Sequence, residues 1–332
     1  MAIITQTSEL KAFVAVTTTL EPEDFAPSIA SAERDYLLPA LGQSLLTSLT
    51  SAYQDSLGSN PPTFPPALLA LLPLAQAVVA NLGFYNYVNS IGTVQVTGSG
   101  ITSSVGKDQK TAFQWQIDDV KKAYQQEGFK CIDALLAFLE ANVSNYSTWK
   151  SSPQYTLYKD TLLYTTPQVE FIYPLYSSRL VFLLLKPSIR HIEETTITDL
   201  LGSTLYDALL LKLVDGTNYS ALEGKVVKLC REATAWLALD LALPSMVAQF
   251  NALGINQQAI EAVTDNNRAV TPASQGIVRN QSNNASSRGL EALQRLRKLL
   301  VANATALAWT APDAQSAINY NEGITGSGIV MF

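Results

Sequence analysis

The sequence predicts a mainly α-helical protein with two tandem, duplicated helical-bundle domains, a small β-hairpin in the first domain, and an extended C-terminal tail. The main observation is a repeat. The segment PSIASAERDYLLPALGQSLLTSL at 27–49 is similar to PSIRHIEETTITDLLGSTLYDAL at 187–209, with eight of 23 residues identical at a constant offset of 160. Apolar residues also recur at helical spacing along most of the chain. With 332 residues, 47% of them hydrophobic, the chain is long enough for two ordinary domains.

The first copy of the repeat begins with a predicted helix over Glu21–Leu41, whose apolar residues lie at helical spacing. Gly42 fits a left-handed cap at its end, and Ser44 can begin the next helix, which we expect to reach Tyr53. A long apolar helix over Pro66–Asn89 should follow as the central core helix.

Strand-like alternation follows in GTVQVTGSGITSSV at 92–105, where Thr-Gly-Ser-Gly reads as a hairpin turn. Two more helices are expected at Ala112–Gln126 and Cys131–Asn142, with Gly128 as the breaker between them. The first copy is therefore predicted to be a bundle with a projecting hairpin.

The second copy repeats this order. Its first helix should end at Gly202, which matches Gly42, because a helix-to-helix corner of fixed geometry requires glycine in both copies. A polar segment rich in Pro, Gly and Asn reads as a loop with at most a weak hairpin, where the first copy has its hairpin. The ranges expected are helices at Leu205–Leu213, at Leu222–Leu243 with Pro244 as a stop, and at Arg288–Trp309, and the loop at Val263–Asn284.

These elements predict four regions. The first module covers 1–148, a packed connector 149–167, the second module 168–310, and a tail 311–332. The tail contains glycines and then an apolar end, which favours docking onto a partner. Its candidate docking residues are Asn319, Tyr320, Ile324, Ile329, Val330, Met331 and Phe332.

Composition limits the possible functions. Charged residues make up only 15%, and the net charge of −6 argues against a protein that grips nucleic acid by its phosphates. It does not exclude a surface past which DNA slides. Cys131 and Cys230 lie in helical patterns and are expected to be buried and reduced. The apolar run Ala67–Val88 is interrupted by Pro73 and polar residues, so we interpret it as a core helix and expect no membrane partner.

No catalytic, cofactor-binding or metal-binding set is recognisable in the sequence. The single histidine, His191, falls opposite Ser31 in the first copy, so the duplicated scaffold does not require it, and its role stays open. The segment GITSSVGKD at 100–108 has the wrong spacing for a phosphate loop and lies in a predicted hairpin. We therefore predict that the protein is not an enzyme and binds no cofactor.

Glu33 and Glu193 are the polar exception shared by the two copies. Each lies one helical turn from apolar residues of the repeat, on or beside the apolar stripe. A glutamate there makes a specific ion pair or hydrogen bond, within the bundle or across an interface, or it extends to water at the edge of the stripe. A two-carboxylate active site is the least favoured of these interpretations.

Four stretches carry a resemblance to a known kind of protein. SELKAFVAV at 8–16 and the helix that follows it resemble the opening of the head-completion or adaptor proteins of tailed bacteriophages. AERDYLLPALG at 32–42, VQVTGSGI at 94–101 and YQQEGFKCIDALLAFLEAN at 124–142 resemble an uncharacterised phage and prophage family of the head-to-tail connector type. The likeness covers most of the first copy and, through the repeat, the start of the second.

This resemblance implies a ring-forming virion protein, assembled in the host cytoplasm, that binds the portal protein on one side and a stopper or tail protein on the other. DNA would pass through its channel. Twelve chains, each with two modules, or six chains that form a ring of twelve similar modules, would match a twelvefold portal. We favour twelve, because the two copies differ too much for equivalent surfaces. Two alternatives stay open, namely another helical scaffold or capsid-associated protein and an enzyme with an unrecognised site.

Overall fold

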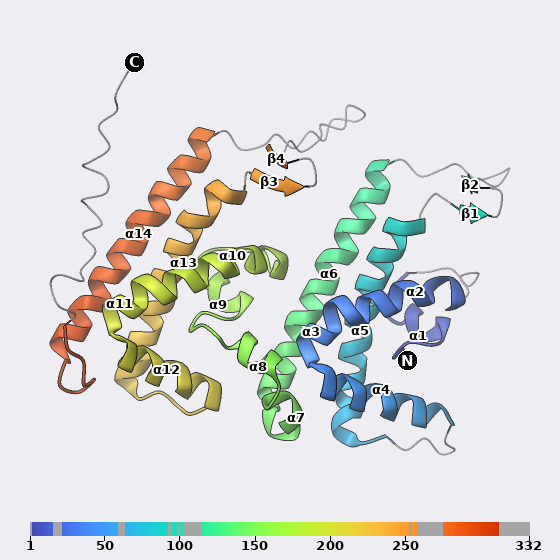
Figure 1. Ribbon diagram of the computed structural model, residues 1–332, viewed down its shortest axis with the longest axis horizontal. Coiled ribbons are helices and arrows are strands. Elements are labelled where there is room, and N and C mark those ends of the chain that lie inside the picture. Colours follow the sequence, from blue (N-terminus) through green and yellow to red (C-terminus); the bar gives the residue numbers. More distant parts are fainter. Residues whose placement is uncertain are drawn as a thin grey trace. The chain divides into compact units, whose positions relative to one another are not determined.

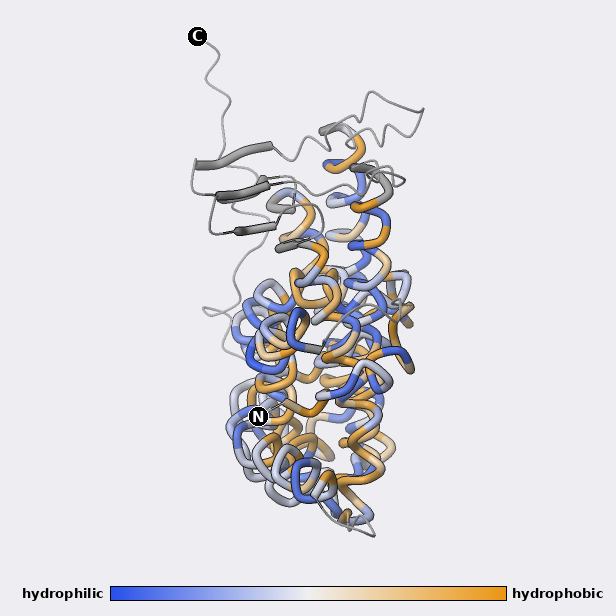
Figure 2. Tube along the Cα trace, turned by 90° about the vertical axis from the view of Figure 1, so that its right-hand side faces the viewer, coloured by the Kyte–Doolittle hydropathy of each residue, from blue (hydrophilic) through white to orange (hydrophobic). Residues whose placement is uncertain are grey.

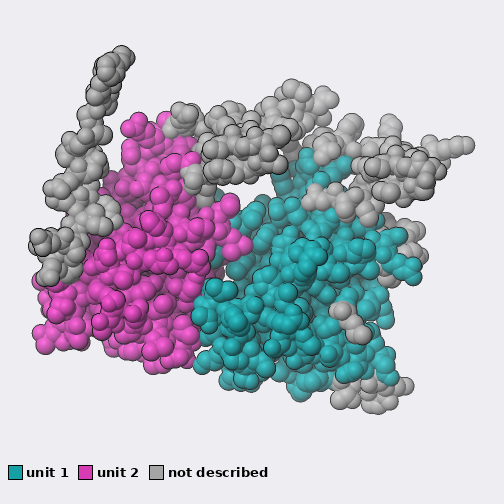
Figure 3. All heavy atoms as spheres, in the orientation of Figure 1, with its two compact units in different colours: residues 1–158, 175–182, 263–268 teal, residues 159–174, 183–262, 269–332 magenta. Residues whose placement is uncertain are grey.

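The computed structural model describes residues 2–15, 22–58, 64–91, 95–97, 100–102, 114–246, 248–251, 254–257 and 275–311. It contains two compact units. The first comprises Met1–Tyr158 with Leu175–Phe182, and the second comprises Lys159–Pro174 with most of the chain from Leu183 onward (Figure 3). Both units are mainly α-helical, as the sequence predicts (Figure 1).

The first unit is a helical bundle in which α5 and α6 lie side by side (Figure 1). The N-terminal helix α2 packs against α5, and a short antiparallel hairpin follows α5. Its elements are α1 (Thr7–Lys11), α2 (Pro22–Ala32), the π-helical turn η1 (Glu33–Leu37), α3 (Leu38–Leu41), α4 (Gln43–Gly58), α5 (Pro66–Ile91), β1 (Gln95–Thr97), β2 (Gly100–Thr102), α6 (Gln114–Ala141), the 3₁₀ turn η2 (Val143–Asn145), α7 (Ser147–Lys150) and α8 (Pro153–Tyr158).

The second unit repeats the same order of elements, with α13 and α14 side by side (Figure 1). Its elements are α9 (Thr166–Glu170), α10 (Arg179–Ile192), the π-helical turn η3 (Glu193–Ile197), α11 (Thr198–Leu201), α12 (Ser203–Asp215), α13 (Ala221–Met246), β3 (Ala248–Asn251), β4 (Gly254–Gln257) and α14 (Gln275–Ala302). The first residues of α10, up to Phe182, cluster with the first unit.

The duplication extends to backbone detail. The turns η1 and η3, and the short helices α3 and α11 after them, begin and end 160 residues apart. Gly42 and Gly202 both have a φ of 76°, so each forms a corner in the left-handed half of backbone space that favours glycine. Each glycine lies between two helices, but its ψ of 160° or 146° differs from that of the left-handed helical cap that the sequence suggested.

The hairpin predicted in the first copy is present, with Val96 opposite Ile101. The second copy also has a hairpin, with Phe250 opposite Ile255. It lies directly after α13, ahead of the polar segment where the sequence suggested at most a weak hairpin. Helix α13 also runs through Pro244 to Met246, because a proline in the last turn costs only one late helical bond.

Gly128 does not break the helix that contains it. Helix α6 runs unbroken through it, and a Cβ at this position would lie 2.5 Å from the Cγ of Leu82 in α5. The second unit has the same contact, because a Cβ at Gly289 in α14 would lie 2.6 Å from the Cγ of Leu237 in α13. Both glycines therefore let two long helices approach closely. The two helices predicted on either side of Gly128 are one helix.

Helix α14 also differs from its prediction. It begins at Gln275, within the segment predicted as a loop, and ends at Ala302 instead of Trp309. The polar composition of its first turns hides their helical character, because few of these side chains are buried. The rest of the predicted loop, at 263–274, lies outside the described residues.

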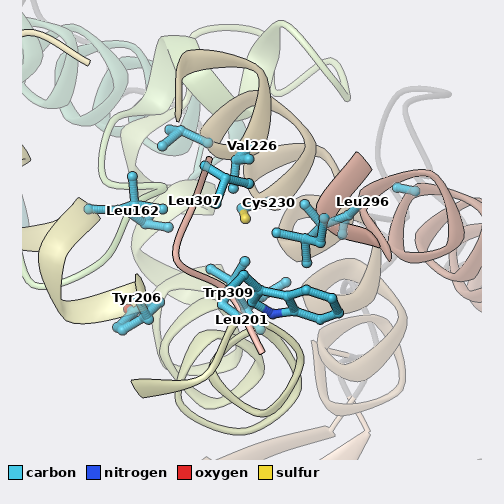
Figure 4. Close-up of a cluster of buried hydrophobic side chains, with 14 residues drawn as sticks. Leu162, Leu201, Tyr206, Val226, Cys230, Leu296, Leu307 and Trp309 are labelled. Carbon is cyan, nitrogen blue, oxygen red and sulfur yellow. The ribbon is translucent and has the colours of Figure 1, made fainter. Parts of the chain in front are cut away.

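Each unit has its own hydrophobic core. Figure 2 shows hydrophobic and hydrophilic residues alternating along the described helices, as expected of helices that bury one face. In the second unit, Trp309, Leu201 and Cys230 belong to one buried cluster (Figure 4). Cys230 is fully buried and Cys131 is half-buried, and both thiols are unpaired. Burial raises the pKa of the Cys131 thiol to about 11.

One described helix, α5, is long and apolar enough to cross a bilayer by length and composition, over Pro66–Val88. Half of its most apolar stretch is buried inside the unit, where Val78, Val79 and Leu82 are fully enclosed. These contacts agree with the interpretation of this run as a core helix.

The stretch 149–167, predicted as a connector, is divided between the two units. Trp149 and Tyr155 are buried in the first unit, whereas Leu162 and Leu163 are fully buried in the second. The predicted tail lies outside the described residues beyond Ala311, and all seven of its candidate docking residues with it.

Candidate functional site

The shared glutamates lie at equivalent places in the two units. Glu33 is the first residue of η1, and Glu193 is the first residue of η3. A π-helical turn carries one extra residue, and such turns occur at functional or strained positions of helices. Each turn follows a helix with an internal proline, Pro27 or Pro187, six residues before the glutamate. The repeat thus keeps both an irregular helix and the carboxylate that it presents.

In the second unit, the Glu193 carboxylate holds the backbone of the segment that precedes α9. The Leu162 N–H donates to its Oε2 at 2.7 Å, and the Leu163 N–H donates to its Oε1 at 3.0 Å. The Tyr206 hydroxyl donates to Oε2 at 2.9 Å. Glu193 is fully buried, and burial raises the pKa of its carboxyl, although these three hydrogen bonds oppose the shift.

A charged cluster surrounds this segment in the second unit. Lys186 Nζ lies 2.5 Å from Asp160 Oδ1 and donates to Thr161 Oγ1 at 2.7 Å. Arg190 pairs with the other oxygen of Asp160, and Arg231 Nε donates to the Leu162 carbonyl at 2.8 Å. Burial lowers the pKa of the Lys186 ammonium. The segment 160–163 is therefore attached through its backbone and its side chains.

The first unit repeats the arrangement with fewer partners. The Ile3 N–H donates to Glu33 Oε1 at 2.7 Å, and Ile3 lies 160 residues before Leu163. Gln76 Nε2 donates to the Ile3 carbonyl at 2.8 Å, and Gln54 Nε2 donates to the Ala2 carbonyl at 2.9 Å. Ile3 is fully buried. We call residues 2–5 and 162–165 the lead segments, and the glutamate that holds each one the clamp.

The side chains around the two clamps have diverged. The residues equivalent to Lys186, Arg190 and Tyr206 are alanine, alanine and leucine in the first copy. Glu33 is only half-buried and borders a depression of about 490 Å³ that also touches Leu46. Burial still raises the pKa of the Glu33 carboxyl, against the hydrogen bond from Ile3. What the copies share is the carboxylate and the backbone that it binds.

A second shared feature closes each repeat. The indole Nε1 of Trp149 donates to the Ala40 carbonyl at 3.0 Å, and the indole Nε1 of Trp309 donates to the Leu200 carbonyl at 3.0 Å. Each acceptor lies two residues before the corner glycine. Sequence reasoning missed this pair, although the offset of 160 between the two tryptophans was a signal that could have found it.

Comparison with known protein families matches this duplicated architecture. A family of unknown function (DUF6712) matches the chain twice, at residues 37–159 and at 197–317. The chain belongs to this family. The two matches begin 160 residues apart, so each copy of the repeat corresponds to one family module, and each match includes the corner glycine and the closing tryptophan. No curated protein and no solved structure matches the chain.

The Glu193 clamp of this DUF6712 protein is enclosed by the groups that it binds. The oxygens of Glu193 are occupied by backbone N–H groups and a tyrosine hydroxyl, which leaves no open face for a substrate. His191, two residues away, is exposed. Within the described part of the chain, no group of three His, Cys, Asp or Glu side chains could hold a metal ion.

The second unit also contains an open groove between α9 and α13. Its volume is about 780 Å³, and Phe171, Tyr219, Lys228 and Trp236 are among its lining residues. The guanidinium of Arg288 lies over the Trp236 ring, 4.6 Å from its centroid. Phe171 is 83% exposed, which is unusual for a phenylalanine. Charged side chains, Lys228, Arg231 and Glu232, line the groove together with these aromatic rings.

Proposed function

We propose that this protein is a structural virion component that forms a ring between the portal and the tail of a tailed phage or phage-like particle. The proposal starts from the resemblance of the first copy to head-to-tail connector proteins. In this role it contacts further copies of itself, the portal protein, and a stopper or tail protein. DNA passes through its channel without being bound.

One observation carries the proposal. Both copies of the repeat use the shared carboxylate to hold a lead segment in place. The backbone N of Ile3 lies 2.7 Å from a Glu33 oxygen, and those of Leu162 and Leu163 lie 2.7 and 3.0 Å from Glu193 oxygens. The polar residue common to both modules thus fixes the fold instead of facing a substrate. Because the shared glutamates bind backbone N–H groups of their own modules, we favour an interaction role over catalysis.

Surface composition supports the same role. Large hydrophobic side chains stay exposed in both units, such as Leu69 at 56%, Phe171 at 83% and Val301 at 61%. Only 15% of the residues are charged, so extensive subunit contacts can form at a low cost of removing charges from water. The net charge of −6 disfavours adhesion to passing DNA.

The divergence of the two modules favours twelve chains over six. A ring of twelve equivalent modules from six chains needs matching surfaces on both copies. The residues equivalent to Lys186 and Arg190 are Ala26 and Ala30, so the surfaces near the clamps differ in charge. Each module then faces a different partner, and twelve chains match a twelvefold portal.

The oligomeric state of the purified full-length chain tests this function. Native mass spectrometry and negative-stain electron microscopy should show a discrete closed ring, alone or on addition of a portal protein. A protein that stays monomeric in both conditions would contradict the connector role and favour another helical scaffold. A low-resolution image of the particle would then locate the chain in the virion.

The tail provides a separate test. Deletion of Asn319–Phe332 should leave the secondary structure and the unfolding midpoint unchanged, while binding to the portal or to a neighbouring copy weakens. Replacement of the same residues by a Gly/Ser segment of equal length controls for chain length. Normal assembly of the truncated chain would show that the tail has no docking role.

A further inference from the structure

Helices α6 and α14 are equivalent in the two copies, at an offset of 161. One face of α6 is covered by another segment of the chain, whereas the equivalent face of α14 is exposed. In the first unit, Arg179 Nη1 lies 2.5 Å from Asp133 Oδ1 of α6, and the two side chains are only 11% and 22% exposed. Leu136, one turn further along α6, is buried. The segment Leu175–Phe182, which clusters with this unit, therefore supplies a partner for α6.

The same face of α14 is open. The positions equivalent to Asp133, Leu136 and Glu140 are Gln294, Arg297 and Val301, and all three are exposed. With Lys298 and Ala302 they line a depression of about 430 Å³. Val301 is 61% exposed. We call these five residues the α14 face.

Charge distinguishes the two helices. Helix α14 contains five basic residues and one acidic residue, whereas α6 contains three basic and five acidic residues. Two of the basic residues of α14 are engaged within the unit, since Arg295 pairs with Glu232 and Arg288 lies over Trp236. Arg297 and Lys298 have no ion-pair partner among the residues that the structure describes. The α14 face is thus positively charged in an acidic protein.

The repeat itself indicates what fits this face. By the offset of 160, the segment that pairs with α6 corresponds to residues 15–22 of the first copy, which lead into α2. The first turn of α2 carries Glu23 and Asp24, and both are exposed. In the first unit, an acidic α6 meets a basic Arg179. A contact between α14 and α2 would have the opposite arrangement, with the basic side chains on α14 and the acidic side chains on α2.

We propose that the α14 face binds the N-terminal turn of α2 in a second copy of this chain. Arg297 and Lys298 then face Glu23 and Asp24, and Val301 is covered. The contact uses the corresponding region of each copy, about one helical turn beyond the positions equivalent to Asp133 and Arg179. It deepens the proposed ring and rests on it.

The exchange of charges gives this contact its direction. The α14 face of one chain joins a different surface, α2, of the next, so each chain offers one donor surface and one acceptor surface. Such a heterologous contact closes into a ring when its rotation divides a full turn. If the segment that contains Arg179 packed against α14 instead of α6, the Arg179 guanidinium would face Arg297 and Lys298. This repulsion between like charges disfavours that alternative pairing.

A charge-exchange experiment on the full-length chain tests the contact, with oligomer mass from native mass spectrometry and sedimentation velocity as readouts. Arg297→Glu with Lys298→Glu should weaken self-association by at least about tenfold, and Glu23→Lys with Asp24→Lys should do the same. The four substitutions in one chain should restore assembly. Lys121→Glu with Lys122→Glu on α6 changes the net charge equally and should leave assembly intact.

The outcomes separate this contact from the ring itself. A wild-type oligomer that neither double variant weakens, or that the combined variant does not restore, would overturn the contact and leave the ring standing. A wild-type chain that is monomeric at every concentration and with the portal protein would overturn both. Weakening by the α14 variant and by removal of residues 312–332, but not by the α2 variant, would assign the face to the tail and refute α2 as its occupant.

Discussion

Glu33 and Glu193 occupy the same position of the repeat, yet they hold their lead segments with different numbers of partners. Glu193 is fully enclosed, accepts two backbone N–H groups and the Tyr206 hydroxyl, and lies near Lys186. Glu33 is half-buried and accepts one backbone N–H. The repeat has therefore retained the bond between carboxylate and lead segment while the side chains around it changed.

The difference follows from the charged groups that each lead segment brings. The second lead segment is preceded by Lys159 and Asp160, and Asp160 attaches it through Lys186 and Arg190. In the first copy, Ala26 and Ala30 stand at the positions of Lys186 and Arg190. The first lead segment is held by Gln54 and Gln76 instead. Removal of one charged group from the more buried cluster therefore costs more stability, because the groups that it paired with stay buried without a partner.

The largest expected effect is the loss of the second clamp. Glu193→Ala should lower the free energy of unfolding of the second unit by about 3–5 kcal/mol, since it leaves two N–H groups and a tyrosine hydroxyl unsatisfied. Glu33→Ala should cost the first unit only about 1–2 kcal/mol. Urea unfolding followed by circular dichroism measures both, with the exposed Glu194→Ala as a control near zero. Equal losses would refute the difference between the clamps.

The next effect should be equal in the two copies. Gly128→Ala and Gly289→Ala should each destabilise their unit by about 1–3 kcal/mol, because the new Cβ would overlap Leu82 or Leu237. Helix propensity alone predicts the opposite sign. Gly224→Ala in α13, where a Cβ meets nothing within 4 Å, is the matched control and should be neutral or slightly stabilising. Stabilisation by all three variants would refute the close helix contact.

A smaller effect tests the closing tryptophans. Trp149→Phe and Trp309→Phe should each cost about 1 kcal/mol, because each loses a 3.0 Å hydrogen bond to a carbonyl near a corner glycine. Thermal unfolding of each variant measures the loss. Trp236→Phe is the control, because the Trp236 ring makes a cation–π contact with Arg288 and the substitution breaks no such hydrogen bond to a carbonyl. A loss confined to one copy would mean that only one module depends on this closure.

The smallest effect concerns pH. Burial raises the pKa of Glu33 and of Glu193 above 4.5, so the folded state holds these protons more tightly than the unfolded chain does. Stability should therefore fall as pH rises from about 4.5 toward the folded-state pKa, by at most about 1.4 kcal/mol per pH unit for one group. Glu193→Gln and Glu33→Gln should each flatten this slope. Urea unfolding between pH 4.5 and 6.5 tests this, and a slope of opposite sign would contradict the raised values.

Lys186 makes a contribution of the opposite sign. Burial lowers its pKa below 10.5, so the unfolded chain holds the proton more tightly there. Stability should accordingly rise with pH across the window below 10.5 in which the folded group loses its proton. Lys186→Met removes this contribution, and the first copy, with Ala26 at the equivalent position, has no counterpart.

The sequence by itself determined the helical class, the duplication, the corners at Gly42 and Gly202, and the first hairpin. These features rest on local signals, namely helical spacing of apolar residues, glycine at a left-handed corner, and an offset of 160 visible in one alignment. It also singled out Glu33 and Glu193, because a carboxylate on an apolar stripe is costly unless something pairs with it.

Only the tertiary structure decided what those glutamates bind and why Gly128 is a glycine. The partners of Glu193 are backbone N–H groups 30 and 31 residues away, and every residue type carries such a group, so no pattern reveals them. Gly128 reads locally as a breaker, but its reason lies in Leu82 of another helix. Long-range packing overrides local propensity where two helices must approach closely, and the sequence records that requirement only as a missing side chain.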